Sequence, residues 1–367
     1  MKRLITASCV CILGIFMAAC KDKESSQNTQ QPDATIDIKV LASGLSHVWD
    51  MALAPDNKLW FTERGGKVSQ LDPVTGNVKE ILRINEVEEK GEGGLLGLAL
   101  HPEFNTTPEV FVVYNFNDNG RYEEKVVKFT YNGTTLINPV ILIDDIAAET
   151  YHNGSRLLIS NDRKLFISTG DAGDQSTPQN IGSVNGKILR INLDGSIPAD
   201  NPSPTSPIWS YGHRNAQGLI IANGKMYSSE HGPNSNDEIN IIEKGRNYGW
   251  PNVEGKCDLP DEQTFCTANN IVEPIYTWTP TIAVCGIDYY NHDLIPQWKN
   301  SIIMATLKES KLYQLKLNEA GTEIESVNEI ISGTYGRLRE VHVTSDGKIY
   351  VSTSNGGDDK IIVISAK

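Results

Sequence analysis

The chain has 367 residues, of which 39% are hydrophobic and 22% are charged, and its formal net charge is −13 at pH 7. This acidic balance argues against nucleic acid or an anionic membrane surface as a partner, because both would be repelled. Clusters of arginine are more informative against such a background, since they oppose the overall charge.

The first residues have the pattern of an export signal. A basic start and an apolar stretch over residues 4–17 lead to a lipobox that ends at Cys20. The stretch is shorter than the roughly 20 residues that span a membrane, so an uncleaved anchor helix is the less favoured alternative. We expect a signal peptide over residues 1–19, lipidation of Cys20 and a flexible tether over residues 20–36.

Processing at this site would change both the location and the charge of the protein. Residues 1–19 contain two basic residues and no acid, so their removal takes the net charge from −13 to −15. The expected location is the periplasm or the cell envelope, with the lipid as the only contact with a membrane. Export to an oxidising compartment also makes a local Cys257–Cys266 disulfide compatible with the sequence and leaves Cys285 as the odd thiol.

From about residue 37 onward the chain consists of short strand-like runs separated by Asn-Gly, Asp-Gly and Gly-Gly turns. Two motifs recur in phase, at intervals that fit a unit of about 50–62 residues. Copies of the first motif are residues 56–62, 162–168, 223–229 and 346–352. Copies of the second are residues 67–71, 125–129, 187–191 and 311–315.

A unit of four short strands that cannot bury its faces alone is typical of a propeller blade. Residues 37–367 contain about six units of about 55 residues, which predicts an all-β, six-bladed β-propeller of four-stranded antiparallel blades. A pair of β-sandwiches is the alternative, which the phased repeat disfavours. We place the first blade at residues 39–90, an irregular insertion at residues 252–273, and a ring-closing pairing of residues 361–364 with the N-terminal strand.

A propeller gathers loops that are distant in sequence around one channel, and several such loops carry reactive side chains. His152 stands before a strand-like run that leads to Gly170-Asp171. Histidine has a free pKa near neutrality and can therefore act as a general base without large tuning. The competing interpretation is a hydrogen-bonded loop histidine, and His213 and His231 are competing bases.

Cations form a second group of candidates. Residues two apart in a strand share a face, so Arg337 and Arg339 should project together. With Lys308 and Arg214 across the channel, they would hold a multiply anionic ligand through charge-assisted hydrogen bonds. The alternative is that these cations form ion pairs with acids on a solvated rim.

The segment after residue 230 has features of a cation site. Gly232-Pro233 forms a turn that exposes carbonyl oxygens, which are hard ligands suited to Ca²⁺. Asp237 and Glu238 are close enough in sequence to supply a second, carboxylate-bound Ca²⁺. The spacing is not that of an EF-hand, and a plain acidic turn is the alternative.

Together these motifs resemble the soluble glucose/sorbosone dehydrogenases, which are quinoprotein aldose sugar dehydrogenases that use pyrroloquinoline quinone (PQQ). The resemblance covers about residues 39–367, and the six-bladed fold that it implies agrees with the repeat count. The motifs that carry it are residues 152–157, 212–215, 230–240, 247–251 and 336–340.

The resemblance implies a role for each candidate. His152 matches the general base, Arg214 and Asn215 match residues that contact the cofactor, and Glu92 matches a position near cofactor and sugar. Three cations match those that bind the PQQ carboxylates: Lys308, Arg337 and Arg339. Gly232 and Pro233 match the carbonyl ligands of the Ca²⁺ that holds PQQ. The structural calcium region is matched by Asp237, Glu238 and the carbonyl of Tyr248.

The implied function is a PQQ- and Ca²⁺-dependent dehydrogenase. It would oxidise aldose sugars at the anomeric carbon to lactones, transfer hydride to PQQ and pass electrons to a soluble acceptor. The alternatives are a propeller lactonase and a non-enzymatic carbohydrate- or protein-binding propeller. The sequence departs from the family at Tyr151, where some members have an acid, at Cys285, which replaces a usual Pro-Ser pair, and in the 252–273 insertion.

Overall fold

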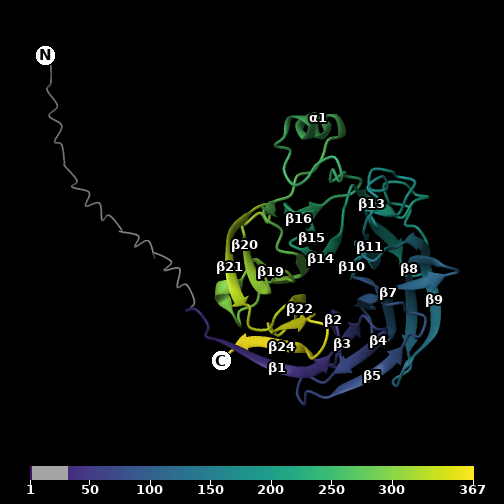
Figure 1. The fold of residues 1–367 in the computed structure, drawn as a ribbon. Helices are drawn as coiled ribbons and strands as arrows, with labels where there is room; N and C mark the ends of the chain where they lie inside the picture. The colour runs from purple at the N-terminus through teal and green to yellow at the C-terminus, as the bar shows by residue number, and fades with distance from the viewer. Residues whose placement is uncertain (2–31) are drawn as a thin grey trace. The chain divides into compact units, whose positions relative to one another are not determined.

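The computed structural model describes residue 1 and residues 32–367, and in this part of the chain 24 strands form six four-stranded antiparallel sheets. The sheets are arranged as blades around a central channel (Figure 1). The predicted six-bladed β-propeller is therefore confirmed. The predicted signal peptide, the lipidation site Cys20 and most of the predicted tether lie outside the described residues.

Each of the first three blades follows the chain from its inner to its outer strand. The first consists of β2 (Val48–Leu53), β3 (Leu59–Glu63), β4 (Lys67–Leu71) and β5 (Val78–Arg83). The second consists of β6 (Leu95–Leu100), β7 (Glu109–Asp118), β8 (Arg121–Tyr131) and β9 (Leu136–Ala147). The third consists of β10 (Gly154–Ile159), β11 (Lys164–Thr169), β12 (Lys187–Asn192) and β13 (Ile208–Tyr211).

The remaining three blades complete the ring. The fourth consists of β14 (Ala216–Ala222), β15 (Lys225–Glu230), β16 (Asp237–Ile242) and β17 (Tyr276–Trp278). The fifth consists of β18 (Val284–Tyr290), β19 (Ser301–Thr306), β20 (Lys311–Leu317) and β21 (Ile324–Ser332). The sixth combines both ends of the described chain: β22 (Leu338–Val343), β23 (Ile349–Thr353), β24 (Asp359–Ala366) and β1 (Ile36–Leu45).

Burial falls from the inner strands of a blade to the outer strand. All residues of β3 and of β19 are buried, whereas most residues of the outer strands β5 and β9 are exposed or half-buried. Strands covered on both faces have near-continuous apolar runs, as in Ile302-Ile303-Met304 of β19. The four copies of the first recurring motif lead into β3, β11, β15 and β23, which are likewise almost entirely buried.

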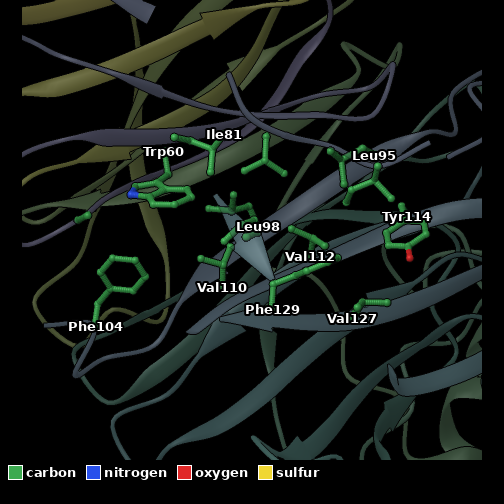
Figure 2. Packing of buried hydrophobic residues seen from close by; sticks show 14 residues of the cluster. Trp60, Ile81, Leu95, Leu98, Phe104, Val110, Val112, Tyr114, Val127 and Phe129 are labelled. Carbon is green, nitrogen blue, oxygen red and sulfur yellow. The ribbon is translucent and has the colours of Figure 1, made fainter. Parts of the chain in front are cut away.

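Apolar side chains fill the space between neighbouring blades. Figure 2 shows one such cluster, in which Trp60 of the first blade lies among residues of the second, including Val110 and Val112. The Trp60 ring packs edge-to-face on Phe104 with a centroid separation of 5.7 Å. Truncating a buried tryptophan to alanine typically costs about 3–5 kcal/mol, so each blade depends on its neighbours for stability.

The ring closes between the two ends of the described chain. Strand β1 pairs antiparallel with β24, from Ile36 opposite Ala366 to Leu45 opposite Asp359 (Figure 1). The predicted closing pair is therefore confirmed. The predicted start of the first blade at residue 39 is wrong, because residues 36–45 are the outer strand of the last blade. This pairing covers the free edge that β24 would otherwise present.

The insertion between β16 and β17 is not entirely irregular. It contains α1 (Pro260–Asn269), and the disulfide Cys257–Cys266 joins this helix to the segment before it. A short 3₁₀ turn, η1 (Pro296–Trp298), precedes β19, and Cys285 is a buried free thiol. No helix within residues 32–367 is long and apolar enough to cross a membrane.

Candidate active site

The candidate residues meet at one end of the channel because of the way the strands run. The inner strands of neighbouring blades contact one another around the ring, as β10 does with β6 and β14. Strand β11 runs antiparallel to β10, and Gly154 at the start of β10 lies opposite Thr169 at the end of β11. Loops that precede an inner strand and loops that follow the second strand therefore lie at the same mouth of the channel.

His152 and Asp171 form a hydrogen-bonded pair at this mouth. The His152 Nδ1 atom lies 2.8 Å from Asp171 Oδ1, and the other carboxylate oxygen accepts a hydrogen bond of 2.8 Å from Trp250 Nε1. Burial opposes ionisation, but hydrogen bonds from His152, Gly173 and Trp250 hold the pKa of Asp171 below its usual value. An ionised Asp171 fixes a proton on Nδ1 and leaves His152 Nε2 as the basic nitrogen.

Sequence reasoning assigned no role to Asp171. The residue lies 19 positions after its partner, at the end of the adjacent strand. The available signal was the strand-exit position of the Gly170-Asp171 pair, opposite the start of β10. A carboxylate at that position is within reach of a side chain that precedes β10.

The turn that carries His152 has an uncommon backbone conformation. His152, Gly154 and Ser155 have φ values of 58°, 69° and 68°. Side chains with a Cβ rarely adopt this region, and each instance costs on the order of 1–3 kcal/mol. The Gly154 N–H donates to Asn215 Oδ1 over 3.0 Å, and the His152 carbonyl accepts a hydrogen bond of 3.0 Å from Ala172. Neighbouring blades and loops therefore hold His152 in place.

The two competing histidines have other surroundings. His213 is fully buried, and its two ring nitrogens lie 2.9 Å from Ser210 Oγ and 2.9 Å from Glu230 Oε2. Both nitrogens are occupied, so His213 has a structural role. His231 is half-buried, and its carbonyl accepts a hydrogen bond of 3.1 Å from Arg214 Nη1.

Arg214 lies between His231 and Trp250. Its guanidinium carbon is 5.3 Å from the centre of the Trp250 ring. Burial lowers the pKa of Arg214, although the nearby acids Asp171 and Glu230 oppose this effect. The same tryptophan thus contacts both the cation and the carboxylate that orients His152.

Arg337 and Arg339 are not equivalent, although the sequence suggested a common face. Arg339 is 4% exposed, and its Nη1 atom lies 2.5 Å from Gln217 Oε1. Arg337 is exposed and precedes β22, which begins at Leu338 and has an irregular register before Glu340. Regular alternation does not hold at this strand start, so one guanidinium is buried in the channel and the other is exposed.

None of the four candidate cations forms an ion pair with a carboxylate of the described residues. The side-chain Nζ of the exposed Lys308 donates only to Thr281 Oγ1 among the described residues, over 3.2 Å. Burial lowers the pKa of Arg339, as expected for a cation without a countercharge. Pairing with acids on a solvated rim, the alternative interpretation, is therefore not observed for these side chains.

Buried hydrogen-bond donors without partners gather in the same loops. Leaving a buried donor unsatisfied costs about 1–3 kcal/mol, which a ligand with acceptor oxygens would recover. Within the described residues four such atoms belong to the candidate site: Arg214 Nε, Asn215 Nδ2, His231 Nε2 and Arg339 Nε. The site is therefore suited to an anionic ligand with several acceptor atoms.

The Gly232-Pro233 turn presents backbone oxygens. No donor of the described residues bonds to the carbonyl of Gly232 or of Pro233. Asp237 is fully buried and braces the turn, because its carboxylate accepts the Gly232 N–H over 2.9 Å and the N–H groups of Ile282 and Ala283 over 2.7 Å each. Free carbonyl oxygens of this kind are suitable ligands for Ca²⁺.

Glu238 and Tyr248 lie behind this turn. Glu238 accepts hydrogen bonds of 2.9 Å from the Gly255 N–H and from Asn240 Nδ2. Burial, followed by the nearby Glu230, raises the pKa of Glu238 to about 8. Residues 32–367 contain no group of three or more His, Cys, Asp or Glu side chains placed to hold a metal ion, so a cation here would depend on backbone carbonyls, such as that of Tyr248.

Glu92 and Tyr151 form the rim next to His152. The His152 N–H donates to Glu92 Oε2 over 3.3 Å, and Glu92 is exposed. The Tyr151 ring is 44% exposed and packs edge-to-face on the His152 ring, with centroids 4.6 Å apart. Both side chains are therefore placed to contact a ligand that reaches the histidine.

A buried ion cluster closes the channel beneath the site. Arg156 pairs with Asp50 over 2.7 Å and with Glu340 over 2.5 Å. The Trp49 ring lies 4.3 Å from the guanidinium of Arg156 and 5.7 Å from that of Arg339. Trp49 therefore lies between the buried ion cluster and Arg339 of the candidate site.

The protein is thus a six-bladed propeller that carries a histidine–aspartate pair, cations without carboxylate partners and free carbonyls at one channel mouth, an arrangement suited to an anionic ligand. The family model described as glucose/sorbosone dehydrogenase matches residues 45–363, and the chain belongs to that family. Its fold and the order of its site motifs agree with this membership.

Relatives with described activities cover almost all of the chain. The quinoprotein glucose dehydrogenase B of Acinetobacter calcoaceticus is 30% identical, over 91% of this chain and 88% of its own. The aldose sugar dehydrogenase YliI of Escherichia coli is 29% identical, over 90% and 93%. The structure of the PQQ-bound aldose sugar dehydrogenase of Streptomyces coelicolor has a TM-score of 0.80 and 32% identity, and the match covers 92% of this chain and 100% of that one.

Proposed function

We propose that the protein is a PQQ- and Ca²⁺-dependent dehydrogenase that oxidises aldose sugars at the anomeric carbon to lactones. The observation that carries the proposal is the set of unpaired cations and unsatisfied buried donors around the His152–Asp171 pair. Cations and buried donors without partners lower the stability of the folded protein, and an anionic ligand that binds to them would offset this loss. Family membership supports PQQ as that ligand.

The residues of this site fit PQQ, a flat polycarboxylate with quinone oxygens. The buried Arg339 and the exposed Lys308 and Arg337 would bind the carboxylates. Arg214 and Asn215 offer free donors on the opposite side of the channel. The carbonyls of Gly232 and Pro233 would hold Ca²⁺ next to the cofactor. When bound, PQQ supplies the hydride acceptor and Ca²⁺ polarises it.

The chain itself supplies the base and its orientation. His152 Nε2 would take the proton of the anomeric hydroxyl, and Asp171 would stabilise the imidazolium that forms. The half-buried Arg214 would stabilise the negative charge that develops at the reacting centre. Tyr151 and Glu92, at the rim next to His152, would contact the sugar.

Reconstitution tests this proposal. Apo-protein treated with EDTA should lack dye-linked oxidation of aldoses, and PQQ and Ca²⁺ together should restore it. A matched control adds PQQ with EDTA, and a second adds Ca²⁺ alone; neither should restore activity. Full dye-linked activity without PQQ would refute the proposal. Hydrolysis of lactones without any dye reduction would favour a lactonase, and PQQ binding without turnover of any aldose would favour a binding propeller. We further propose a soluble electron acceptor and a lipid anchor at Cys20, in the periplasm or cell envelope.

A further inference from the structure

The turn that presents His152 rests on a side chain from the neighbouring blade. Ser155, which has a φ of 68°, is fully buried, and its hydroxyl contacts Glu124 Oε2. Glu124 lies on β8 of the second blade and is 1% exposed. The same hydroxyl lies 3.2 Å from the carbonyl of Asn153. A buried carboxyl group therefore joins the second blade to the base-carrying turn of the third.

The number of available protons determines the state of this carboxyl group. A serine hydroxyl can donate only one hydrogen bond. With an ionised Glu124, Ser155 would donate to the carboxylate and the Asn153 carbonyl would lose its donor. With a protonated Glu124, the acid donates to Ser155, and Ser155 donates to Asn153, so that both contacts are satisfied. The geometry therefore favours the neutral acid.

The surroundings of Glu124 agree with a neutral group. It faces the amide of Asn115 from β7 and the hydroxyl of Ser155 from β10, and its backbone pairs with Ile146 of β9. The titratable neighbour is Tyr122 of β8, whose own pKa is raised by burial and by acids that include Glu124. No cation of the described residues forms an ion pair with Glu124. Burial raises the pKa of Glu124 to about 8, against the effect of its hydrogen bonds.

The glycine-rich loop before β6 covers the same region. A Cβ atom at Gly93 would lie 2.3 Å from the Tyr122 hydroxyl and 2.7 Å from Asn115 Oδ1. Lys90 of this loop lies 5.3 Å from the Tyr122 ring centre, so its charge faces the tyrosine. The Gly94 N–H donates to Asn115 Oδ1 over 2.9 Å. The loop next to Glu92 and the turn of His152 therefore share one buried polar support.

We propose that Glu124, as a neutral carboxylic acid, is a positioning residue that holds Ser155 in its left-handed conformation and thereby aims His152 into the channel. Glu124 contacts neither substrate nor cofactor and acts only through the turn. The catalytic part of this inference rests on the proposed function. The protonation and the positioning of His152 do not, and both can be measured in apo-protein.

Three variants separate the hydrogen bond from the charge. In Glu124→Gln the amide still donates to Ser155 but cannot ionise, so the rate of sugar-dependent PQQ reduction at pH 7 should stay within about twofold. Glu124→Leu and Ser155→Ala remove the link, and misplacement of a base costs about 10² in rate. PQQ affinity should be unchanged in all three. A parent-like rate in both Glu124→Leu and Ser155→Ala would overturn the proposal.

The pH profile adds a readout that a purely structural role would not change. The neutral acid predominates below its pKa of about 8 and is lost as the pH rises through that value. The parent rate should therefore fall on the alkaline side, and Glu124→Gln should lack this fall. An alkaline fall that is identical in parent and Glu124→Gln would contradict the assignment.

Two measurements on apo-protein are independent of PQQ chemistry. The infrared difference spectrum of the parent minus Glu124→Gln at pH 7 should contain a band of a protonated carboxyl group, because the other carboxyl groups contribute equally to both proteins. The nitrogen NMR signals of the His152 ring should shift in Ser155→Ala and stay in place in Glu124→Gln. If the parent lacks sugar oxidation but shows both signals, the proposed function fails and the positioning role stands. Absence of both signals overturns the positioning role.

Discussion

Replacement of Arg339 by methionine should have opposite effects on the ligand-free protein and on the PQQ complex. Arg339 is 4% exposed, has no carboxylate partner among the described residues, and donates hydrogen bonds only to Gln217 Oε1 and, over 3.8 Å, to Cys285 Sγ. A buried, unpaired charge costs several kcal/mol, whereas a charged hydrogen bond returns about 1.5–3 kcal/mol. Methionine fills a similar volume without that charge, so the apo variant should be at least as stable as the parent.

The complex should respond in the other direction. Removing one partner of a buried charge pair costs about 2–5 kcal/mol, which corresponds to a loss of PQQ affinity of about 30- to 4,000-fold. Arg337→Met is the matched control, because the same substitution at the exposed Arg337 should cost at most about 1 kcal/mol, or about fivefold. Isothermal titration with PQQ at saturating Ca²⁺ measures both affinities, and scanning calorimetry of the apo-proteins measures Tm.

Two results would refute this reasoning. Equal affinity losses in the two variants would mean that burial does not distinguish the arginines. A marked drop in the Tm of apo Arg339→Met, with PQQ affinity unchanged, would mean that Arg339 stabilises the fold and does not bind the cofactor.

Three further predictions concern the base, its partner and the anchor. His152→Ala should slow sugar-dependent PQQ reduction by at least about 10² while PQQ still binds. Stopped flow measures this rate, with His213→Ala as the control, and a parent-like rate in His152→Ala would exclude His152 as the base. Asp171→Asn should lower the same rate by about 10² or more without weakening PQQ binding, because the amide no longer secures the proton on His152 Nδ1. An unchanged rate would show that the His152–Asp171 pair is only structural. Mass spectrometry of the native N-terminus should find diacylglyceryl-Cys20, and an unlipidated start elsewhere would contradict the lipoprotein prediction.

The blade repeat could be predicted because its signal is local. A turn followed by a short apolar strand occupies about ten residues, and its recurrence in phase is visible in the sequence alone. The membership of residues 36–45 in the last blade depends on pairing with a strand more than 300 residues away, for which no local pattern exists. The helix α1 has one buried residue, the polar Glu262, and so lacks the apolar stripe that reveals a helix.

In the candidate site, too, residues with a local sequence signal could be predicted, whereas residues that depend on contacts distant in sequence could not. His152, Arg214 and the Gly232-Pro233 turn were identified because each lies within a compact motif. Asp171 was missed because its connection with His152 runs across two strands. The difference between Arg337 and Arg339 depends on an irregular register at the start of β22, which regular strand alternation does not predict.

The sixth blade combines strands from both ends of the described chain, and this affects the order of folding. The strand made first, β1, finds its partner only after β24, the strand made last, has left the ribosome or crossed a membrane. Until then the growing chain is an open row of blades with an unsatisfied edge at each end, and closure carries the long loop-entropy cost of a non-local contact. Shortening β1 from Ile36 onward would therefore leave the interior blades in place and lower the barrier to opening of the ring at this seam.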